Sequence, residues 1–229
     1  MKFNGFQKMT LLDYPGKVAC TLFTAGCNFK CPFCHNSLLV TNISDSDTFD
    51  SKEILSFLSK RVGLLDGVCI TGGEPLLQKE LPDFLSEVKA IGFKIKLDTN
   101  GSLPDKLKEL VNNRLVDYVA MDIKNSPEKY PITAGAEIDI SKVKESVDFL
   151  ISSGIDYEFR TTVVSPFHEE DDFEKIGRFI NGAKDYYLQG FVDSGHLISD
   201  KCSAISRDRM EAMRKRVLPF VKNASLRGV

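Results

Sequence analysis

The sequence predicts an α/β fold built on a parallel β-sheet. Three observations support this prediction: six β-like runs alternate with six amphipathic helical patterns, the chain has 229 residues, and 42% of its residues are hydrophobic while 27% are charged. A strand–helix alternation implies right-handed crossovers between parallel strands. Six such units are too few for a closed eight-stranded barrel, and periodicity alone leaves an open sheet and a partial barrel as alternatives.

The predicted strands are short runs rich in β-branched and aromatic residues. In the first of them Val18, Cys20 and Leu22 alternate onto one face. Cys20 and Cys69 lie within strand patterns, and we expect both to be small core residues. The six runs span residues 17–24, 67–71, 93–98, 116–122, 157–164 and 184–191.

The predicted helices carry start and stop signals. Asp50 and Ser51 precede the helical pattern over residues 52–60 and suit an N-cap, while Gly92 suits the C-cap of residues 80–91. We expect one domain over residues 1–229, in which residues 205–229 form a C-terminal helix and tail. The remaining helical patterns cover Pro104–Asn112 and residues 141–153, 171–180 and 206–221.

Charge and composition exclude several classes of protein. The chain has 30 basic and 32 acidic residues, and this balance argues against a protein that coats nucleic acid or binds a membrane surface. No apolar run approaches the ~20 residues of a membrane helix, and residues 1–10 lack an apolar signal core. Six cysteines are too few for a secreted disulfide scaffold of this length, so we expect a cytoplasmic protein with reduced thiols.

Three cysteines gather in one loop directly after the first strand. Cys27, Cys31 and Cys34 have the spacing C-x3-C-x2-C, and three thiolates so placed can bind an iron–sulfur cluster. A zinc site would want a fourth ligand, and His35 follows Cys34 too closely to reach the same centre easily. Zinc and a chance grouping of buried cysteines are the alternatives. A three-thiolate [4Fe–4S] cluster leaves one iron open, which indicates substrate or cofactor chemistry; Cys202 receives no role.

The cysteine loop resembles the cluster motif of the radical S-adenosylmethionine superfamily, in which an aromatic residue, here Phe33, precedes the last cysteine. His35 and Asn36 look like the same flank in the glycyl radical enzyme activating proteins, and Phe33 and His35 become candidates for contact with the cofactor. Residues 11–17, LLDYPGK, resemble the branch that activates anaerobic ribonucleoside-triphosphate reductase, whereas pyruvate formate-lyase activases typically show Asp-Gly-Pro-Gly and an Arg there. By themselves these residues are a turn before the first strand. The resemblance covers about residues 6–191 and implies a partial (β/α)6 barrel.

The resemblance also implies roles for polar residues at the ends of two strands. Gly72, Gly73 and Glu74 match the turn that binds the amino end of S-adenosylmethionine, although a plain strand-to-helix turn would have the same sequence. Asp98 and Thr99 end the third strand and begin the family's Asp-Thr-Asn-Gly pattern. Asp98 is expected to face the cofactor or a nearby cation.

The fourth strand ends in Asp122, Ile123 and Lys124, which match an Asp-hydrophobic-Lys pattern of the activases. The resemblance implies that Lys124 meets the carboxylate or ribose of the cofactor and that Asp122 belongs to the same polar floor. Taken alone, a strand-end aspartate here and in the third strand equally suits a cap of the next helix.

Arg160 and Thr162 lie two residues apart on the fifth strand and therefore share a face. Arg160 is a candidate to orient the carboxylate or ribose of the cofactor, with an exposed strand-end arginine as the alternative. His196 is a further cofactor candidate, although its surroundings depart from the activase pattern Leu-Pro-Tyr-His, and we expect His168 to be a solvated loop residue. These motifs fall at the C-terminal ends of different predicted strands, where α/β proteins assemble their sites.

The implied cofactors are one [4Fe–4S] cluster and S-adenosylmethionine. A single cluster is expected because no further cysteine follows Cys34 before the second strand. A monovalent cation near Asp98 and Asp122 is an additional expectation. In the family, reductive cleavage of S-adenosylmethionine yields a 5′-deoxyadenosyl radical, which removes a hydrogen atom from a glycine of a partner protein.

The implied partners are an anaerobic ribonucleotide reductase and a low-potential electron donor such as a flavodoxin or ferredoxin, with no nucleic acid and no membrane. Three alternatives stay open. They are activation of another glycyl radical enzyme such as pyruvate formate-lyase, a radical enzyme that acts on a small molecule, and a non-enzymatic zinc or iron–sulfur module. The further polar strand ends argue against the last alternative.

Overall fold

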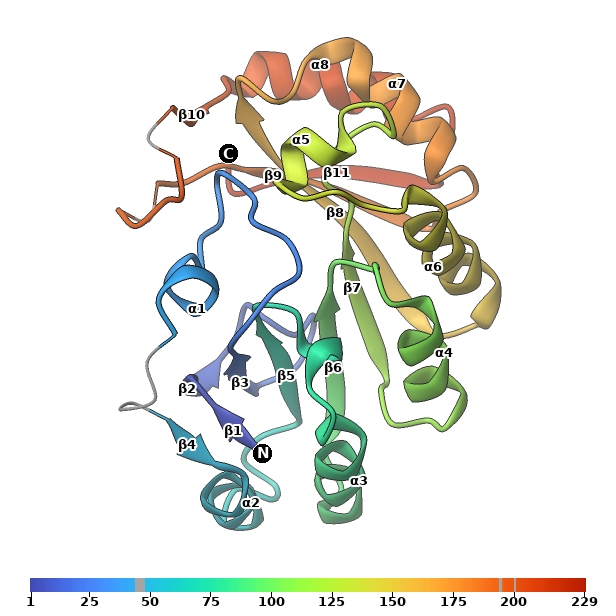
Figure 1. Cartoon of the computed structure of the whole chain (residues 1–229). Helices are drawn as coiled ribbons and strands as arrows, with labels where there is room; N and C mark the ends of the chain where they lie inside the picture. Colours follow the sequence, from blue (N-terminus) through green and yellow to red (C-terminus); the bar gives the residue numbers. More distant parts are fainter. Residues whose placement is uncertain (44–47, 194, 200) are drawn as a thin grey trace. The chain divides into compact units, whose positions relative to one another are not determined.

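The computed structural model describes residues 1–43, 48–193, 195–199 and 201–229, and the chain divides into two compact units (Figure 1). The first unit comprises residues 1–27, 38–99 and 105–119, and the second comprises residues 28–37, 100–104 and 120–229. The boundary falls within strand β7 (Tyr118–Asp122). A single domain over the whole chain stays a prediction.

The sheet of the first unit has the strand order β2-β3-β5-β6. Strands β3, β5 and β6 run parallel, whereas β2 pairs antiparallel with β3. The bounds are β2 Gly5–Thr10, β3 Ala19–Thr24, β5 Gly67–Gly72 and β6 Lys94–Thr99, and a small antiparallel pair is formed by β1 Lys2–Phe3 and β4 Phe49–Asp50. The helices are α1 Leu38–Thr41, α2 Ser51–Ser59, η1 Pro75–Leu77, α3 Leu81–Ile91 and α4 Pro104–Asn112, of which α4 enters the unit at residue 105.

The helices of the first unit begin and end where their sequence signals predict. The Asp50 carboxylate caps α2 by accepting the Lys52 N–H at 2.8 Å. Gly92 ends α3 in the left-handed conformation, with φ at 109°, which glycine adopts without steric cost. The apolar stripe of α3 is buried: Leu81, Phe84, Leu85 and Val88.

The second unit contains three parallel strands in the order β8-β9-β11. Their bounds are β8 Asp156–Ser165, β9 Asp185–Gly190 and β11 Asn223–Arg227, and the short β10 Ser203–Ala204 pairs antiparallel with β8. Helices α7 and α8 lie side by side in Figure 1. The helices of this unit are α5 Tyr130–Ala134, α6 Ile140–Ser153, α7 Glu170–Phe179 and α8 Arg207–Val217.

The two faces of each parallel sheet differ in polarity. In the first unit one face is fully buried and apolar, whereas the face that carries Thr21, Cys69, Lys96 and Asp98 is largely polar. Parallel sheets usually bury apolar side chains on both faces because helices cover both. A polar second face therefore indicates a surface arranged for a ligand. The apolar face comprises Cys20, Leu22, Val68, Ile70, Ile95 and Leu97.

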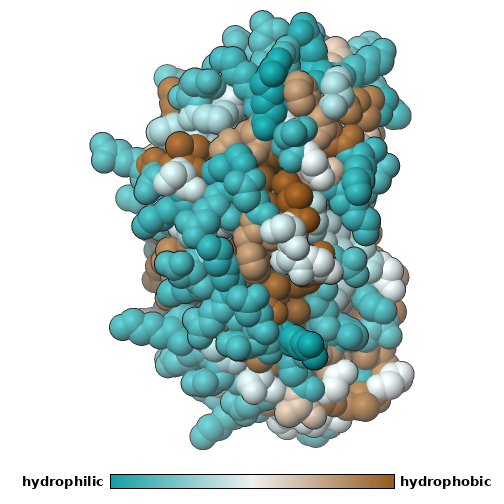
Figure 2. All heavy atoms as spheres, turned by 90° about the vertical axis from the view of Figure 1, so that its right-hand side faces the viewer, coloured by the Kyte–Doolittle hydropathy of each residue, from teal (hydrophilic) through white to brown (hydrophobic). Residues whose placement is uncertain are grey.

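The second unit repeats this division. Phe159, Val163 and Leu188 are fully buried, while Glu158 and Arg160 share the other face of β8. The space-filling view of Figure 2 shows one face of the molecule, on which hydrophilic side chains dominate and apolar ones lie between them. Among the residues that the structure describes, no helix is long and apolar enough to cross a membrane.

The predicted α/β alternation is confirmed, since each of the six predicted strands is present within two residues at either end. The helix predicted over residues 206–221 is wrong at its end. Helix α8 ends at Val217, and the chain then turns so that the Lys222 N–H donates to the Ala183 carbonyl at 2.9 Å and starts strand β11. The described strands that the prediction lacks are β1, β2, β4, β10 and β11.

Candidate functional site

The two glycines at the end of β5, Gly72 and Gly73, are required by the protein's own backbone. A Cβ at Gly72, whose φ is 114°, would lie 2.3 Å from the Thr24 carbonyl oxygen. A Cβ at Gly73 would lie 2.0 Å from the carbonyl oxygen of Gly26, directly before the first cysteine of the loop. The Glu74 N–H donates to the same Gly26 oxygen at 2.8 Å. The turn therefore packs against the start of the cysteine loop.

Glu74 lies buried at the end of this turn, with 1% of the residue exposed. Its Oε1 accepts the Leu76 N–H at 3.1 Å, which caps η1, and the Thr99 hydroxyl at 2.8 Å. The predicted residues Glu74 and Thr99 are thus in direct contact, although they come from different strand ends. A carboxylate held in this way is oriented before any ligand arrives.

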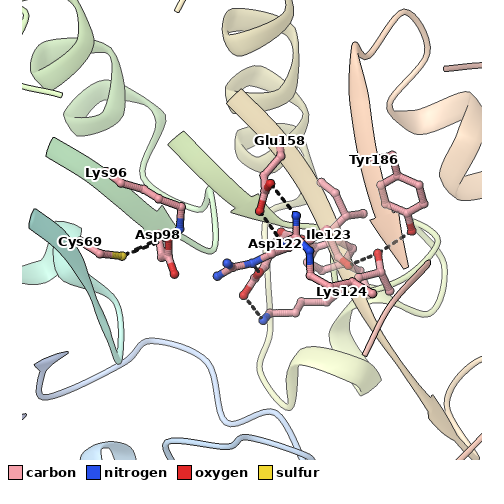
Figure 3. Close-up of polar contacts among 12 residues, drawn as sticks. Cys69, Lys96, Asp98, Asp122, Ile123, Lys124, Glu158 and Tyr186 are labelled. Atoms are coloured by element: carbon pink, nitrogen blue, oxygen red, sulfur yellow. Dashed lines mark hydrogen bonds and ion pairs between the residues drawn. The ribbon is translucent and has the colours of Figure 1, made fainter. Parts of the chain in front are cut away.

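Asp98 is paired with a lysine of its own strand. The Lys96 ammonium forms an ion pair with Asp98 Oδ1, and the Cys69 thiol lies 3.8 Å from the same oxygen (Figure 3). Only 2% of the Lys96 side chain is exposed, compared with 14% for Asp98. No motif in the sequence points to Lys96. Cys69 is fully buried, as expected, but it also belongs to this polar group.

The segment LLDYPGK folds over the first unit's polar face at the amino end of its parallel strands. The Asp13 carboxylate accepts the Thr21 hydroxyl at 2.5 Å. The Tyr14 residue is only 4% exposed, and a Cβ at Gly67 would lie 3.0 Å from its ring. The segment is therefore more than a turn, because its aromatic ring occupies the space that Gly67 leaves.

Asn100 and Gly101 hold the cysteine loop within the second unit. The Asn100 amide donates to Asn28 Oδ1 at 2.9 Å, and the Asn28 amide donates to the Ser102 hydroxyl at 2.8 Å. Gly101 has φ at 73°, and a Cβ there would lie 2.0 Å from the Met121 methyl carbon. This Asn-Gly pair is therefore both a turn and an anchor for the residue after Cys27.

Helix α5 holds the middle of the same loop. The Lys30 N–H donates to the Ala134 carbonyl at 2.9 Å. Gly135 follows with φ at 63°, and a Cβ there would lie 2.1 Å from the Lys30 carbonyl oxygen. Further along, the Ser199 N–H donates to the Pro32 carbonyl at 2.9 Å. The loop between Cys27 and Cys34 is thus held both by the Asn28 side chain and by backbone groups of Lys30 and Pro32.

The remaining predicted residues of this loop differ in burial. Phe33 is 5% exposed, and its ring centroid lies 6.0 Å from that of Phe167. His35 is exposed and lies beside Phe191, with ring centroids 6.0 Å apart. His196 is also exposed, and its carbonyl oxygen accepts a hydrogen bond from Ser37.

Asp122 lies between two cations in the second unit. Its Oδ1 is 2.6 Å from Arg160 Nε, and its Oδ2 is 2.8 Å from Lys124 Nζ (Figure 3 labels Asp122 and Lys124). Burial alone would raise the pKa of Asp122, but Arg160 and Lys124 outweigh it and hold that pKa well below its ordinary value. Burial lowers the pKa of Lys124, and the Asp122 carboxylate more than compensates, so the ammonium is retained. Thr162 is half-buried on the face that carries Arg160.

The backbone of Asp122, Ile123 and Lys124 is held by side chains. The Tyr130 hydroxyl donates to the Asp122 carbonyl at 3.4 Å, and the Thr161 hydroxyl donates to the Ile123 carbonyl at 2.6 Å. A third carbonyl, that of Lys124, lies 2.8 Å from Nε2 of His168. Three successive carbonyls therefore have a side-chain partner each, and this holds the backbone from which the Lys124 side chain extends.

The prediction that His168 is a solvated loop residue is wrong. His168 is 2% exposed; the Val164 N–H donates to its Nδ1 at 3.2 Å, and this leaves Nε2–H to donate to the Lys124 carbonyl. Burial lowers the pKa of His168, which favours the neutral ring that this arrangement needs. The following Glu169 and Asp172 form the capping box of α7; the Asp172 carboxylate also favours the charged ring, but burial outweighs it.

The family model described as the radical SAM superfamily matches residues 21–180. The chain belongs to the radical SAM superfamily. A protein of Methanocaldococcus jannaschii named as a glycyl-radical enzyme activating enzyme, MJ1227, is 33% identical over 193 residues, which cover 82% of this chain and 79% of that protein. Within the superfamily, the chain therefore belongs to the glycyl-radical enzyme activating enzymes.

Solved structures show the same radical SAM fold. A domain of the pyruvate-formate lyase-activating enzyme from Bacteroides vulgatus aligns with a TM-score of 0.58 at 17% identity and covers 71% of this chain and 99% of that chain. SuiB of Streptococcus suis bound to S-adenosylmethionine aligns with a TM-score of 0.69 at 12% identity and covers 90% of this chain and 48% of that chain. The predicted fold class, an α/β partial barrel of the radical SAM type, is confirmed, and the described strands form no closed barrel.

The thiols of this radical SAM enzyme fit an iron–sulfur cluster in their chemistry. None of the six cysteines forms a disulfide, and cluster ligands are thiolates. Burial raises the pKa of Cys34, while the Lys124 ammonium acts in the opposite direction; the Cys31 thiolate in turn favours charged Lys124. Among the described residues no three His, Cys, Asp or Glu side chains already converge on one point, and Cys27 falls in the first unit. The ligand set Cys27, Cys31 and Cys34 stays a prediction.

The structure joins some predicted residues into groups and adds others. In the first unit Glu74 contacts Thr99, and in the second unit Asp122 contacts Lys124 and Arg160. Sequence reasoning missed Lys96, Tyr130, His168 and the pair Glu158–Arg227, since a tyrosine or lysine in these patterns carries no signal of burial. One signal could have found Lys96 and Glu158. Both are polar residues at strand positions whose side chains, by alternation, would face a ligand.

Proposed function

We propose that this activating enzyme acts on an anaerobic ribonucleoside-triphosphate reductase. The segment LLDYPGK supports this choice, because it resembles that branch and is built into the first unit through Asp13 and Tyr14. The relationship to MJ1227 supports the activation of a glycyl radical enzyme in general. A low-potential electron donor such as a flavodoxin or ferredoxin belongs to the same proposal.

Cys27, Cys31 and Cys34 would hold one [4Fe–4S] cluster, and Gly72, Gly73 and Glu74 would lie at the amino end of S-adenosylmethionine. When bound, the cluster and S-adenosylmethionine supply one-electron cleavage and the abstraction of a hydrogen atom from a glycine. The protein's own contribution is to bind and orient these two cofactors and to exclude water.

The charges of the two groups suit the amino-acid end of this cofactor. Glu74 offers a buried carboxylate for an ammonium group. In the second unit Asp122 carries one negative charge, while Lys124 and Arg160 carry two positive charges, so one positive charge is left for a carboxylate. The single observation that carries the proposed cofactor site is Lys124: its ammonium lies 2.8 Å from Asp122 Oδ2, and the carbonyl groups of Asp122, Ile123 and Lys124 each have a side-chain hydrogen-bond partner.

The cluster is tested first. After anaerobic reconstitution we expect about four iron and four sulfide per chain. Changing Cys27, Cys31 or Cys34 to Ala should abolish the cluster, whereas Cys202→Ala and Cys20→Ala should retain it and serve as matched controls. A control variant that loses the cluster would contradict the three-ligand assignment.

The target is tested by electron paramagnetic resonance. The reduced holoprotein, mixed with S-adenosylmethionine and an anaerobic ribonucleotide reductase, should give a glycyl doublet, and the same mixture with pyruvate formate-lyase should give little signal. Lys124→Ala should reduce the doublet while the cluster spectrum persists. A doublet with the lyase alone would move the assignment to that enzyme, and no doublet with either would favour a small-molecule substrate.

A further inference from the structure

Lys96 is a buried ammonium that the proposed function leaves unused. Its side chain is 2% exposed, its Nζ is paired with Asp98 Oδ1, and the Cys69 sulfur lies 3.8 Å from the same Nζ (Figure 3). The strand register places Lys96 opposite Cys69 on the polar face of the first unit. A buried ammonium is costly without a partner, so the pair with Asp98 is a specific arrangement of this chain.

Asp98 is one of the two carboxylates at which the sequence predicted a monovalent cation. The structure does not fit that expectation, because the Lys96 ammonium already lies against the carboxylate and the Cys69 thiol donates to the same oxygen. A second cation at this oxygen would meet the ammonium at short range, and like charges repel strongly where little water screens them. Asp122, within its own unit, is likewise neutralised by Arg160 and Lys124.

We propose that Lys96 replaces the monovalent cation, so that binding of S-adenosylmethionine requires neither sodium nor potassium. The inference rests on the proposed cofactor site. Lys96 acts through Asp98 and is a positioning residue: it fixes the charge and direction of this carboxylate, while the cofactor is bound by other groups.

The first experiment measures the dissociation constant of S-adenosylmethionine for the reconstituted holoprotein in choline, sodium and potassium chloride at equal ionic strength. Wild type should differ by less than about twofold among the three salts. Lys96→Met should bind about tenfold or more weakly in choline and recover in sodium or potassium, because one partner of a buried pair is then missing. Lys94→Met, two residues earlier on the same strand face and 58% exposed, is the matched control and should show neither effect.

The second experiment needs no S-adenosylmethionine. The melting temperature of the Lys96→Ala holoprotein should fall in choline chloride and rise again with ethylammonium, which can fill the space of the missing side chain, whereas wild type and Lys94→Ala should not respond. If Lys96→Ala does not fold, Lys96→Met with sodium or potassium in place of choline gives the same comparison.

Two outcomes overturn the inference. The first is wild-type binding of S-adenosylmethionine that tightens about tenfold with sodium or potassium. The second is that no added cation restores the Lys96 variants in either experiment. Failure of wild type to bind S-adenosylmethionine in any salt would instead contradict the proposed function. The melting experiment would then still decide whether Lys96 serves as the cation of Asp98.

Discussion

The two compact units place charge on the polar faces of their strands in different ways. In the first unit the ion pair Lys96–Asp98 is internal and electrically balanced. In the second unit Asp122 is shared by Arg160 and Lys124, each of which is 17% exposed, and the group keeps one positive charge. A balanced, buried ion pair can only hold its own carboxylate in position, whereas an unbalanced and accessible group can also bind an anion.

The second unit also contains an ion pair with a buried carboxylate, Glu158–Arg227. Arg227 of β11 forms two hydrogen bonds with Glu158 of β8, at 2.9 and 3.0 Å, and its guanidinium lies 3.8 Å from the centroid of the Tyr187 ring. Glu158 is 1% exposed, so this carboxylate depends on its partner. The last strand of the described sheet is thus tied to β8 across β9 by charge as well as by strand pairing.

The largest expected effect separates the two carboxylates. Asp122→Ala leaves two cations without their shared partner, and Asp98→Ala leaves one. Breaking a buried pair costs about 3–5 kcal/mol. Partial exposure lessens this cost for each cation beside Asp122, but two cations lose their partner there, so we expect both variants to lower the free energy of unfolding by about 3–5 kcal/mol, and Asp122→Ala by more than Asp98→Ala. Urea denaturation measures both. Equal losses of the free energy of unfolding would show that the second cation beside Asp122 adds nothing to the stability of the fold.

The next effect concerns the glycines under the cysteine loop. Gly73→Ala in the first unit and Gly135→Ala in the second would each drive a Cβ into a carbonyl oxygen, at 2.0 and 2.1 Å. We expect a loss of about 2–4 kcal/mol and poor retention of iron on gel filtration, since backbone must move. Gly154→Ala is the control, because its Cβ meets nothing within 4 Å and only the left-handed backbone is strained. Normal iron retention in Gly135→Ala would contradict the anchoring role of α5.

A smaller effect follows from pH. Because the pKa of Asp122 is depressed in the fold, its stabilisation is complete above the ordinary value of 3.8 and is lost as the pH falls through the lower folded value. The raised pKa of Lys124 acts in the opposite sense: its contribution is complete below 10.5 and is lost only as the pH rises beyond that value. Thermal melts between pH 5 and 2 should therefore show a loss of about 1–2 kcal/mol in wild type that is reduced in Asp122→Asn. An unchanged slope in that variant would assign the acid sensitivity to other carboxylates.

The smallest effect is expected at an exposed pair outside both polar faces. Lys144 and Asp148 lie one turn apart on α6, with side chains 42% and 58% exposed. Lys144→Ala should change the free energy of unfolding by about 0.3–0.5 kcal/mol, because water screens such pairs. This variant sets the baseline against which the buried groups are judged, and a loss as large as that of Asp98→Ala would remove the distinction between them.

Much of the fold follows from the sequence because the parallel strands and their helices depend on local patterns. The apolar alternation of β3, β5 and β6 and the caps at Asp50 and Gly92 are all confirmed. Strand β11 could not be predicted in this way, since its sequence NASLR is mostly polar and is defined by pairing with β9 and by the contact of Arg227 with Glu158. Non-local partners decide such a segment.

The candidate site shows the same division. The motif residues Glu74, Asp122 and Lys124 can be found from spacing and resemblance, but their partners cannot. Lys96 and His168 look like surface residues in the sequence, and only the fold shows that they are buried. Burial of a polar side chain depends on which distant groups satisfy it, and this information lies outside any local window.

The contact between Tyr14 and Gly67 has a consequence for the comparison of sequences. A Cβ at position 67 would lie 3.0 Å from the ring at position 14 and 2.9 Å from the Lys94 carbonyl oxygen. The two positions should therefore covary: relatives that keep the tyrosine should keep the glycine, and a larger residue at 67 should require a smaller one at 14 together with a shift of the neighbouring strand. An alignment rich in chains with both a bulky residue at 67 and an aromatic ring at 14 would show that this coupling does not constrain the family.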